Sequence, residues 1–288
     1  MNADINIAFR EVLLKTFKDV IDFLNENGLR WYAAYGTILG AIRHKGLIPW
    51  DDDIDIYMPR DDYNKLLAIS GSLSKTNISL LTYHNVGYIY SFGKFINNKT
   101  TLWEQKEFPF VTGVYIDVFP LDLTYEENSK IEQNYKKYAK HLRCLQSVYQ
   151  HHTIYSYMRC VKYYGLSWIK DNLYSKLFPN KAIKKFIEFD NSLNTDSGDK
   201  FVRYAVSGYA IYPKIWFNTF YEVPFENLII RIPSGYKELL EQCYGDYMIL
   251  PPLEKRISAH THYYLNLKES LSIQEVMNRI STGEYLVY

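Results

Sequence analysis

Apolar side chains recur every three or four residues over positions 5–24, and this run ends at Gly28. The spacing predicts an amphipathic helix at the start of the chain. Shorter apolar runs then predict a strand over 30–35, a short helix over 37–44 and a strand over 53–58. A proline at position 59, with acidic residues soon after it, indicates that a third helix follows this strand.

Beyond this point, apolar runs predict strands over 78–83, 87–96, 99–103 and 113–122. From about 125 to 190 the pattern changes to long helical periods rich in lysine and tyrosine. The stretch 191–200 is a loop by composition, and a strand pair over 220–233 and a helix ending near 245 follow it. We therefore predict an α+β protein, a mixed sheet flanked by helices, divided into segments 1–124, 125–196 and 197–288.

One stretch, GLIPWDDDIDIYMPR at 46–60, combines features that rarely occur together: four aspartates fall within five positions, with isoleucines among them. In an extended strand, residues two apart share a face, so Asp51, Asp53 and Asp55 point one way and Ile54 and Ile56 point into the core. Neighbouring carboxylates repel one another and resist burial unless a cation holds them. The pattern favours a site for a hard divalent cation such as Mg²⁺.

Three other interpretations compete for this stretch. A calcium-binding EF-hand loop also begins with alternating acids, but it requires glycine at its sixth position, where this chain has Ile56. The Asp-x-Asp motif of a sugar-nucleotide glycosyltransferase stays open as an alternative. A solvated acidic turn is the simplest alternative, and the interleaved isoleucines count against it.

Residues outside this stretch extend the predicted site. Gly36 and Thr37, in YGTILG, lie between a predicted strand and a helix N-terminus, where backbone N–H groups and the helix dipole suit a phosphate. Asp117, in YIDVF, lies between apolar residues on a predicted core strand, and a buried aspartate is costly unless it is paired or bound to a metal. These features predict one site with a phosphate-binding turn and three acids.

The stretch GTILGAIRHKGLIPWDDDIDIYMPRDDY resembles the signature of the LicD family, whose relatives include fukutin and fukutin-related protein and which belongs to the nucleotidyltransferase-fold superfamily. The resemblance resumes at YIDVFPLD and YGDYMILPPLEKR, and it covers about 20–122 and 220–262. It implies a nucleotidyltransferase-like catalytic core in 1–124 that is completed by 197–288. The segment 125–196 would then face the acceptor or a membrane.

The resemblance also implies an activity: a metal-dependent transferase that moves a phosphoryl-alcohol group from a CDP-activated donor to a glycan hydroxyl. In bacterial members the group is typically phosphocholine from CDP-choline, the acceptor is a teichoic acid or lipopolysaccharide sugar, and CMP is released. Asp53, Asp55 and Asp117 match the metal-binding acids, which would hold one or two Mg²⁺ ions or Mn²⁺ instead. Gly36 and Thr37 match the phosphate turn. Glycerol phosphate, as the transferred group, and a degenerate non-catalytic scaffold stay open as alternatives.

Four basic residues are candidate phosphate contacts: Arg43, Lys94, Lys255 and Arg256. Arg43 equally suits the C-terminus of a helix, where the dipole favours a cation. A surface charge explains the other three as well. A choline group would need an aromatic cage, for which the sequence offers many candidates without selecting among them: Trp31, Tyr35, Tyr57, Tyr88, Trp103 and Tyr115.

Composition restricts the partners and the compartment. The 33 basic and 32 acidic side chains leave a formal net charge of +1, which argues against nucleic acid as a partner. Three widely spaced cysteines and the lack of any apolar run of about 20 residues favour a protein of the reducing cytoplasm. Because acceptors in the LicD family are often lipid-linked, peripheral contact with the inner face of the cell membrane is compatible with this expectation.

Overall fold

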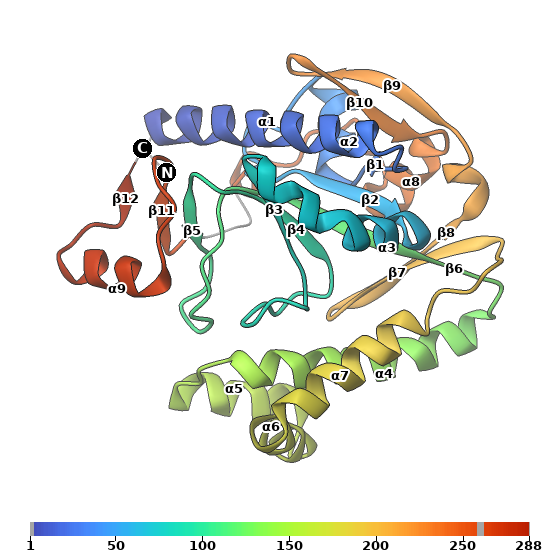
Figure 1. Cartoon of the computed structure of the whole chain (residues 1–288). Helices are drawn as coiled ribbons and strands as arrows, with labels where there is room; N and C mark the ends of the chain where they lie inside the picture. The colour runs from blue at the N-terminus through green and yellow to red at the C-terminus, as the bar shows by residue number, and fades with distance from the viewer. Residues whose placement is uncertain (1–2, 258–261, 288) are drawn as a thin grey trace.

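The computed structural model describes residues 3–257 and 262–287 (Figure 1). Its helices are α1 (Ala3–Glu26), α2 (Tyr35–Arg43), α3 (Arg60–Ile69), α4 (Asn128–Tyr149), α5 (Ile154–Tyr164), α6 (Ser167–Leu177), α7 (Pro179–Asn191), α8 (Tyr236–Tyr244) and α9 (Ile273–Ser281). Short 3₁₀ helices are η1 (Ser70–Lys75), η2 (Lys214–Phe217) and η3 (Leu253–Lys255). The strands are β1 (Tyr32–Ala33), β2 (Asp55–Pro59), β3 (Ile78–Leu81), β4 (Gly93–Asn97), β5 (Thr101–Trp103), β6 (Tyr115–Thr124), β7 (Lys200–Ala205), β8 (Gly208–Pro213), β9 (Phe220–Phe225), β10 (Leu228–Pro233), β11 (Tyr264–Asn266) and β12 (Leu286–Val287).

The central sheet is mixed, and in the described ranges it has seven strands, with β1, β2, β6, β4 and β3 in that spatial order. β2 and β6 are parallel, whereas β1–β2, β4–β6 and β3–β4 are antiparallel pairs. The long strand β6 continues beyond this group, and its C-terminal end pairs with the β7–β8 hairpin. The predicted α+β architecture is therefore confirmed.

Two helical layers lie on opposite sides of this sheet (Figure 1). Helices α1 and α3 contact the central strands, and α1 contributes buried residues at helical spacing, including Phe9, Leu13 and Phe17. Helices α4–α7 form the other layer, which has its own apolar core with Tyr138 and Phe186 and packs beneath β7. No helix in the described ranges is both long enough and apolar enough to cross a membrane.

The observed elements differ from the predicted ones mainly at their ends. β2 begins at Asp55, two residues later than predicted, and α2 begins at Tyr35, so Gly36 and Thr37 lie inside its first turn. β4 begins at Gly93 because residues 84–92 form turns and bends. The β7–β8 hairpin and the C-terminal elements β11, α9 and β12 were not predicted from the apolar pattern. The division at 124 and 196 stays a prediction.

Candidate active site at the start of the second strand

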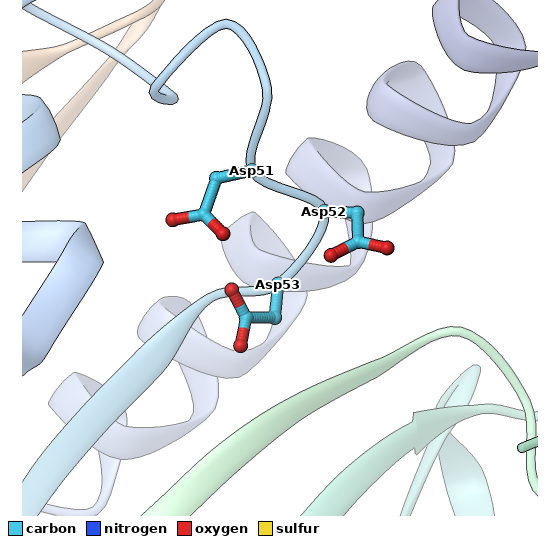
Figure 2. A group of neighbouring side chains, drawn as sticks. All are labelled: Asp51, Asp52 and Asp53. Carbon is cyan, nitrogen blue, oxygen red and sulfur yellow. The ribbon is translucent and has the colours of Figure 1, made fainter. Parts of the chain in front are cut away.

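A loop of three consecutive aspartates leads into β2. Asp51, Asp52 and Asp53 can each direct one carboxylate oxygen so that the three oxygens lie within 4.8 Å of one another. In the described part of the chain, this is the only group of three or more potential metal ligands with such spacing. Figure 2 shows the carboxylates of Asp51 and Asp53 on one side of the loop and that of Asp52 on the other. This tight group shares Asp53 with the predicted metal-binding set.

The other two predicted acids lie directly opposite each other on neighbouring strands. Asp55 pairs with Asp117 in the parallel register of β2 and β6, and Asp117 pairs with Lys94 of β4 on its other side. Opposite residues on adjacent strands point to the same face of a sheet, so the three side chains form a row. The Lys94 Nζ lies 2.9 Å from the Asp117 Oδ1, and the Lys94 side chain is almost fully buried.

The electrostatics of Asp55 reflect this crowding of carboxylates. Burial raises the pKa of Asp55 well above its ordinary value, and the negative charges of Asp53, Asp117 and Asp51 raise it further. Lys94 lowers this pKa, but it is outweighed. Additional positive charge would therefore stabilise the ionised form of Asp55, and a divalent cation supplies such charge.

The first turn of α2 fixes the positions of these acids. The Thr37 hydroxyl accepts a hydrogen bond of 2.8 Å from the Asp55 N–H. A Cβ at Gly36 would lie 2.5 Å from the Asp51 Oδ2, so only glycine leaves room for that carboxylate. Tyr35, at the start of this turn, has a φ of 40°, a left-handed conformation that is rare for a bulky residue.

Contacts from distant parts of the chain hold the loop that precedes the aspartates. Arg10 of α1 donates hydrogen bonds to the Leu47 and Ile48 carbonyls at 3.3 and 3.2 Å. The Glu226 carboxylate, in the turn between β9 and β10, accepts a hydrogen bond of 3.0 Å from the Leu47 N–H. The aspartate loop is thereby attached to both the first helix and the C-terminal part of the chain.

The four predicted phosphate contacts lie in different environments. Lys94 pairs with Asp117. Arg43 donates hydrogen bonds to the Tyr247 and Ile249 carbonyls at 2.9 and 3.4 Å, so it anchors the segment after α8. The guanidinium of Arg256 lies 5.4 Å from the ring centre of Trp50, the residue before the aspartate loop. Lys255 is exposed on η3. The structure therefore brings Lys94 and Arg256 towards the acids.

Two further titratable residues, His262 and Glu104, lie beside the site, and neither is among the predicted site residues. The His262 Nε2 lies 3.3 Å from the Asp52 Oδ2, which brings the C-terminal tail against the aspartate loop. The Glu104 carboxylate accepts hydrogen bonds from the Tyr115 and Tyr90 hydroxyls at 2.8 and 3.2 Å and lies 3.6 Å from the Lys94 Nζ. The contact of His262 with Asp52 joins segments far apart in the sequence, whereas the contacts of Glu104 join the end of strand β5 to residues within 90–115.

The aromatic residues near the acids surround a cation that the chain itself supplies. The Lys94 Nζ lies 3.3 Å from the ring centre of Tyr115 and 4.8 Å from that of Tyr90, in cation–π geometry. Of the six candidate cage residues, Tyr35 is the one that is half-buried, and the other five are buried: Trp31, Tyr57, Tyr88, Trp103 and Tyr115. The exposure of these six side chains therefore does not identify a choline site among them.

The strands that carry these acids, β2 and β6, lie in a region that matches a known nucleotidyltransferase domain. Residues 28–153 match the LicD/FKTN/FKRP nucleotidyltransferase domain. The chain is 28% identical to the lipopolysaccharide cholinephosphotransferase LicD of Haemophilus influenzae over 84% of this chain and 92% of that protein. The chain therefore carries a LicD-family domain, as the sequence predicted.

Two further relatives match shorter parts of the chain. A protein of Rickettsia prowazekii, RP689, is 29% identical over 43% of this chain and 46% of its own length. The human ribitol 5-phosphate transferase FKRP is 33% identical over 21% of this chain and 12% of its own length. Of these three relatives, the bacterial cholinephosphotransferase is the one whose similarity spans most of the chain.

Proposed function

We propose that this protein is a transferase that moves phosphocholine from CDP-choline to a hydroxyl of a lipopolysaccharide or teichoic acid precursor and releases CMP. The similarity to a lipopolysaccharide cholinephosphotransferase over most of both chains supports the transferase class. The observation that carries the proposal is the row of Asp55, Asp117 and Lys94 beside Asp53, which puts carboxylates and a cation on one face of three adjacent strands.

We propose that Asp53, Asp55 and Asp117 hold one or two Mg²⁺ ions, with Mn²⁺ as a substitute. The donor set fits, since carboxylate oxygens are the protein ligands that such hard cations prefer. The raised pKa of Asp55 is the expected signature of several carboxylates gathered in a buried place. When bound, the metal would neutralise charge on the donor diphosphate and on the leaving phosphate.

The residues of the chain have separate tasks in this proposal. Thr37 fixes the backbone at Asp55, and Lys94 holds the orientation of Asp117. Asp117 accepts the proton of the acceptor hydroxyl as its oxygen attacks the phosphorus that carries choline, while the bond from that phosphorus to CMP breaks in line. The N-terminus of α2 at Gly36 and the side chains of Arg43, Lys255 and Arg256 are the proposed phosphate contacts.

A second donor class has a specific observation in its favour. The relative FKRP is named a ribitol 5-phosphate transferase, so another alcohol phosphate, such as glycerol phosphate, is the alternative group. A sugar-nucleotide glycosyltransferase is disfavoured, because it would need a nucleotide-binding parallel sheet before the Asp-x-Asp motif. Here β1 is the strand that precedes β2 in the described ranges, and it is antiparallel to β2.

The test is a donor panel. The protein is incubated with Mg²⁺ and CDP-choline, CDP-glycerol, CTP or UDP-sugars, and CMP, pyrophosphate and UDP are quantified by chromatography. We expect CMP from CDP-choline, with loss of CMP release in EDTA and recovery with Mg²⁺ or Mn²⁺. Release from CDP-glycerol alone would favour the alternative donor. Pyrophosphate from CTP or UDP from a UDP-sugar would contradict the proposed class.

We also propose that the protein works in the cytoplasm, at the inner face of the membrane that carries a lipid-linked acceptor. Large apolar side chains are exposed on and beside α5 and α6, including Ile154, Met158, Leu166 and Leu173. Lysines on the same helices add positive charge that anionic lipids attract. The protein should sediment together with phosphatidylglycerol vesicles. The double variant Ile154→Ser with Met158→Ser should stay in the supernatant. Equal binding of the two proteins to the vesicles would contradict this contact.

A further inference from the structure

A cavity of about 710 Å³ lies between the edge of the sheet and the second helical layer. Its walls come from residues 89–92, from Gln105 and Phe108, from α4, α5 and α6, and from the turn between β7 and β8 at 205–207. This volume is typical of a small-molecule site and is sufficient for a short oligosaccharide. Among the described residues that line it there is no proposed metal or phosphate ligand, so the cavity is a separate space beside the acids.

One wall of the cavity is shared with the acidic site. Tyr90 and Phe92 line the cavity, and the Lys94 Nζ lies 4.8 and 5.6 Å from the centres of their rings. The same Nζ lies 2.9 Å from the Asp117 Oδ1. The ring of Phe92 also lies 4.4 Å from that of Phe119, which shares the sheet face of Asp117. A ligand in the cavity would therefore reach the acids along this aromatic wall.

The charges in the cavity select an anion. Arg143 of α4 and Arg159 of α5 line it, and no aspartate or glutamate does so within the described ranges. Neither arginine has an ion pair with a carboxylate of a described residue, and the guanidinium of Arg143 lies 4.8 Å from the ring centre of Tyr164. Two guanidinium groups without acidic partners repel a quaternary ammonium group, so the cavity is unsuited to choline and suited to a phosphate or carboxylate.

The remaining lining fits a sugar. Amide and hydroxyl side chains, such as Gln105, Gln146 and Ser147, can donate and accept hydrogen bonds with sugar hydroxyls. Flat apolar faces for sugar rings come from six aromatic residues, which are Tyr90, Phe92, Phe108, Tyr163, Tyr164 and Trp168. A mixture of aromatic faces with a few polar groups is characteristic of sites for small organic ligands.

We propose that this cavity binds the acceptor and that the acceptor is an anionic glycan. Its sugar rings pack on the aromatic wall, its phosphate or carboxylate groups contact Arg143 and Arg159, and a free hydroxyl lies towards Asp117. This inference rests on the proposed function, because it names the second substrate of the same site. It also gives the helical layer a role in recognising the acceptor.

Binding can be measured without donor or metal. Isothermal titration calorimetry compares trehalose 6-phosphate with unphosphorylated trehalose and with inorganic phosphate. We expect trehalose 6-phosphate to bind about tenfold more tightly, or better, than either of the other two. Arg143→Gln with Arg159→Gln should weaken its binding by about tenfold or more. The control Lys162→Gln with Lys170→Gln removes the same charge from α5 and α6 outside the cavity, and it should change the affinity by about twofold or less.

Three outcomes would overturn the proposal: no binding of trehalose 6-phosphate, binding of inorganic phosphate with equal affinity, or equal losses in the arginine and lysine variants. Circular dichroism melts establish that each variant is folded, and the two single arginine variants serve if the double variant is not.

CMP release from CDP-choline with water in place of the glycan hydroxyl, measured in parallel, tests the carboxylates alone. Arginine-dependent binding without any CMP release would reject the proposed donor and leave the cavity assignment standing. CMP release without arginine-dependent binding would reject the cavity assignment alone.

Discussion

Two groups of buried charges lie on the same strand, β6, and they differ in how many acids surround one cation. In the first, Arg60 at the start of α3 lies between Asp122 of β6 and Asp190 of α7. Its guanidinium donates two hydrogen bonds to each carboxylate, at 2.6 and 3.1 Å to Asp122 and at 2.9 and 3.3 Å to Asp190. The Tyr83 hydroxyl donates a further hydrogen bond to Asp190 at 3.1 Å. The donors of one cation are thus directed at two acids.

The second group, five residues earlier on β6, gathers more acids around Asp55. Asp117 and Asp55 lie beside Asp51 and Asp53, and the lowering effect of Lys94 on the pKa of Asp55 is smaller than the effects that raise it. The first group resembles a buried ion pair that joins elements: it connects the sheet to the helical layer. The second favours the arrival of a further cation. The number of acids around one cation, two at Arg60 and four at Lys94, is thus a better marker of a functional site here than burial of charge as such.

The largest expected effect is on activity, in the acid-rich group. Asp53→Asn should lower the rate of CMP release by about 10³-fold, since loss of metal-held charge stabilisation costs about 4 kcal/mol in the transition state. Steady-state kinetics with CDP-choline and Mg²⁺ measure this. Asp61→Asn, an exposed acid of the same motif, is the matched control and should keep near-normal activity. A variant at Asp53 that retains full turnover would remove the proposed metal assignment.

The next largest effect is on stability, in the group of Arg60, Asp122 and Asp190. Arg60→Leu leaves Asp122 and Asp190 buried without their cation, so the free energy of unfolding should fall by about 3–5 kcal/mol. Urea denaturation followed by circular dichroism measures the change. Lys136→Leu, which removes an exposed lysine paired with the exposed Glu132, should leave the free energy of unfolding nearly unchanged. Equal losses of unfolding free energy in the two variants would show that the buried network stabilises the fold no more than a surface ion pair does.

These two groups also show how far the sequence predicts the structure. The alternation of acids and isoleucines at 51–56 and the isolated Asp117 led to the prediction of one acidic site, but the expected strand alternation does not extend to Asp51, Asp52 and Asp53, which lie in a loop before β2. The observed start of β2 at Asp55 was not predictable, since it depends on the hydrogen bond from the Asp55 N–H to Thr37. The family motifs contain both Arg60 and Asp122, yet nothing local indicates that they form a pair.

Long-range partners account for most of what the sequence did not reveal. Asp190 is 130 residues from Arg60, and the contact of His262 with Asp52 depends on the return of the tail to the site. The β7–β8 hairpin was missed for a similar reason: its partner is the far end of β6, which extends two residues beyond the predicted strand. The sequence therefore predicted most helices and the core strands better than the contacts between distant segments.

A smaller effect, of opposite sign to that of Arg60→Leu, is expected at Asp55. Its folded-state pKa is raised above the unfolded value, so its contribution to stability is full at low pH and is lost as pH rises through the folded pKa. Without metal, Asp55→Asn should therefore raise the free energy of unfolding at pH 8 more than at pH 5. Urea titrations at the two pH values, in EDTA, measure this difference.

Bound metal should reverse this dependence of stability on pH. Added Mg²⁺ should stabilise the unsubstituted protein more at pH 8 than at pH 5, because a carboxylate must lose its proton to bind a cation. In EDTA the control Asp61→Asn should lack both the gain in stability expected of Asp55→Asn and its change with pH. A loss of stability in Asp55→Asn at pH 8 would mean that the acid-rich group is balanced in the folded protein, and the contrast with Arg60 would not hold.

The smallest expected effect concerns the glycine that gives Asp51 its place. Gly36→Ala puts a methyl group 2.5 Å from the Asp51 Oδ2, so Asp51 must move away from its neighbours. We expect the Mg²⁺ concentration for half-maximal CMP release to rise about tenfold, which corresponds to about 1.4 kcal/mol. The free energy of unfolding should stay the same or rise slightly, because alanine favours the helix that contains Gly36 in its first turn.

The control is Gly71→Ala, where nothing lies within 4 Å of the added Cβ, and it should leave the Mg²⁺ requirement unchanged. If both alanine variants behave alike, Asp51 has no part in arranging the acids, and the acid-rich group reduces to Asp53, Asp55 and Asp117.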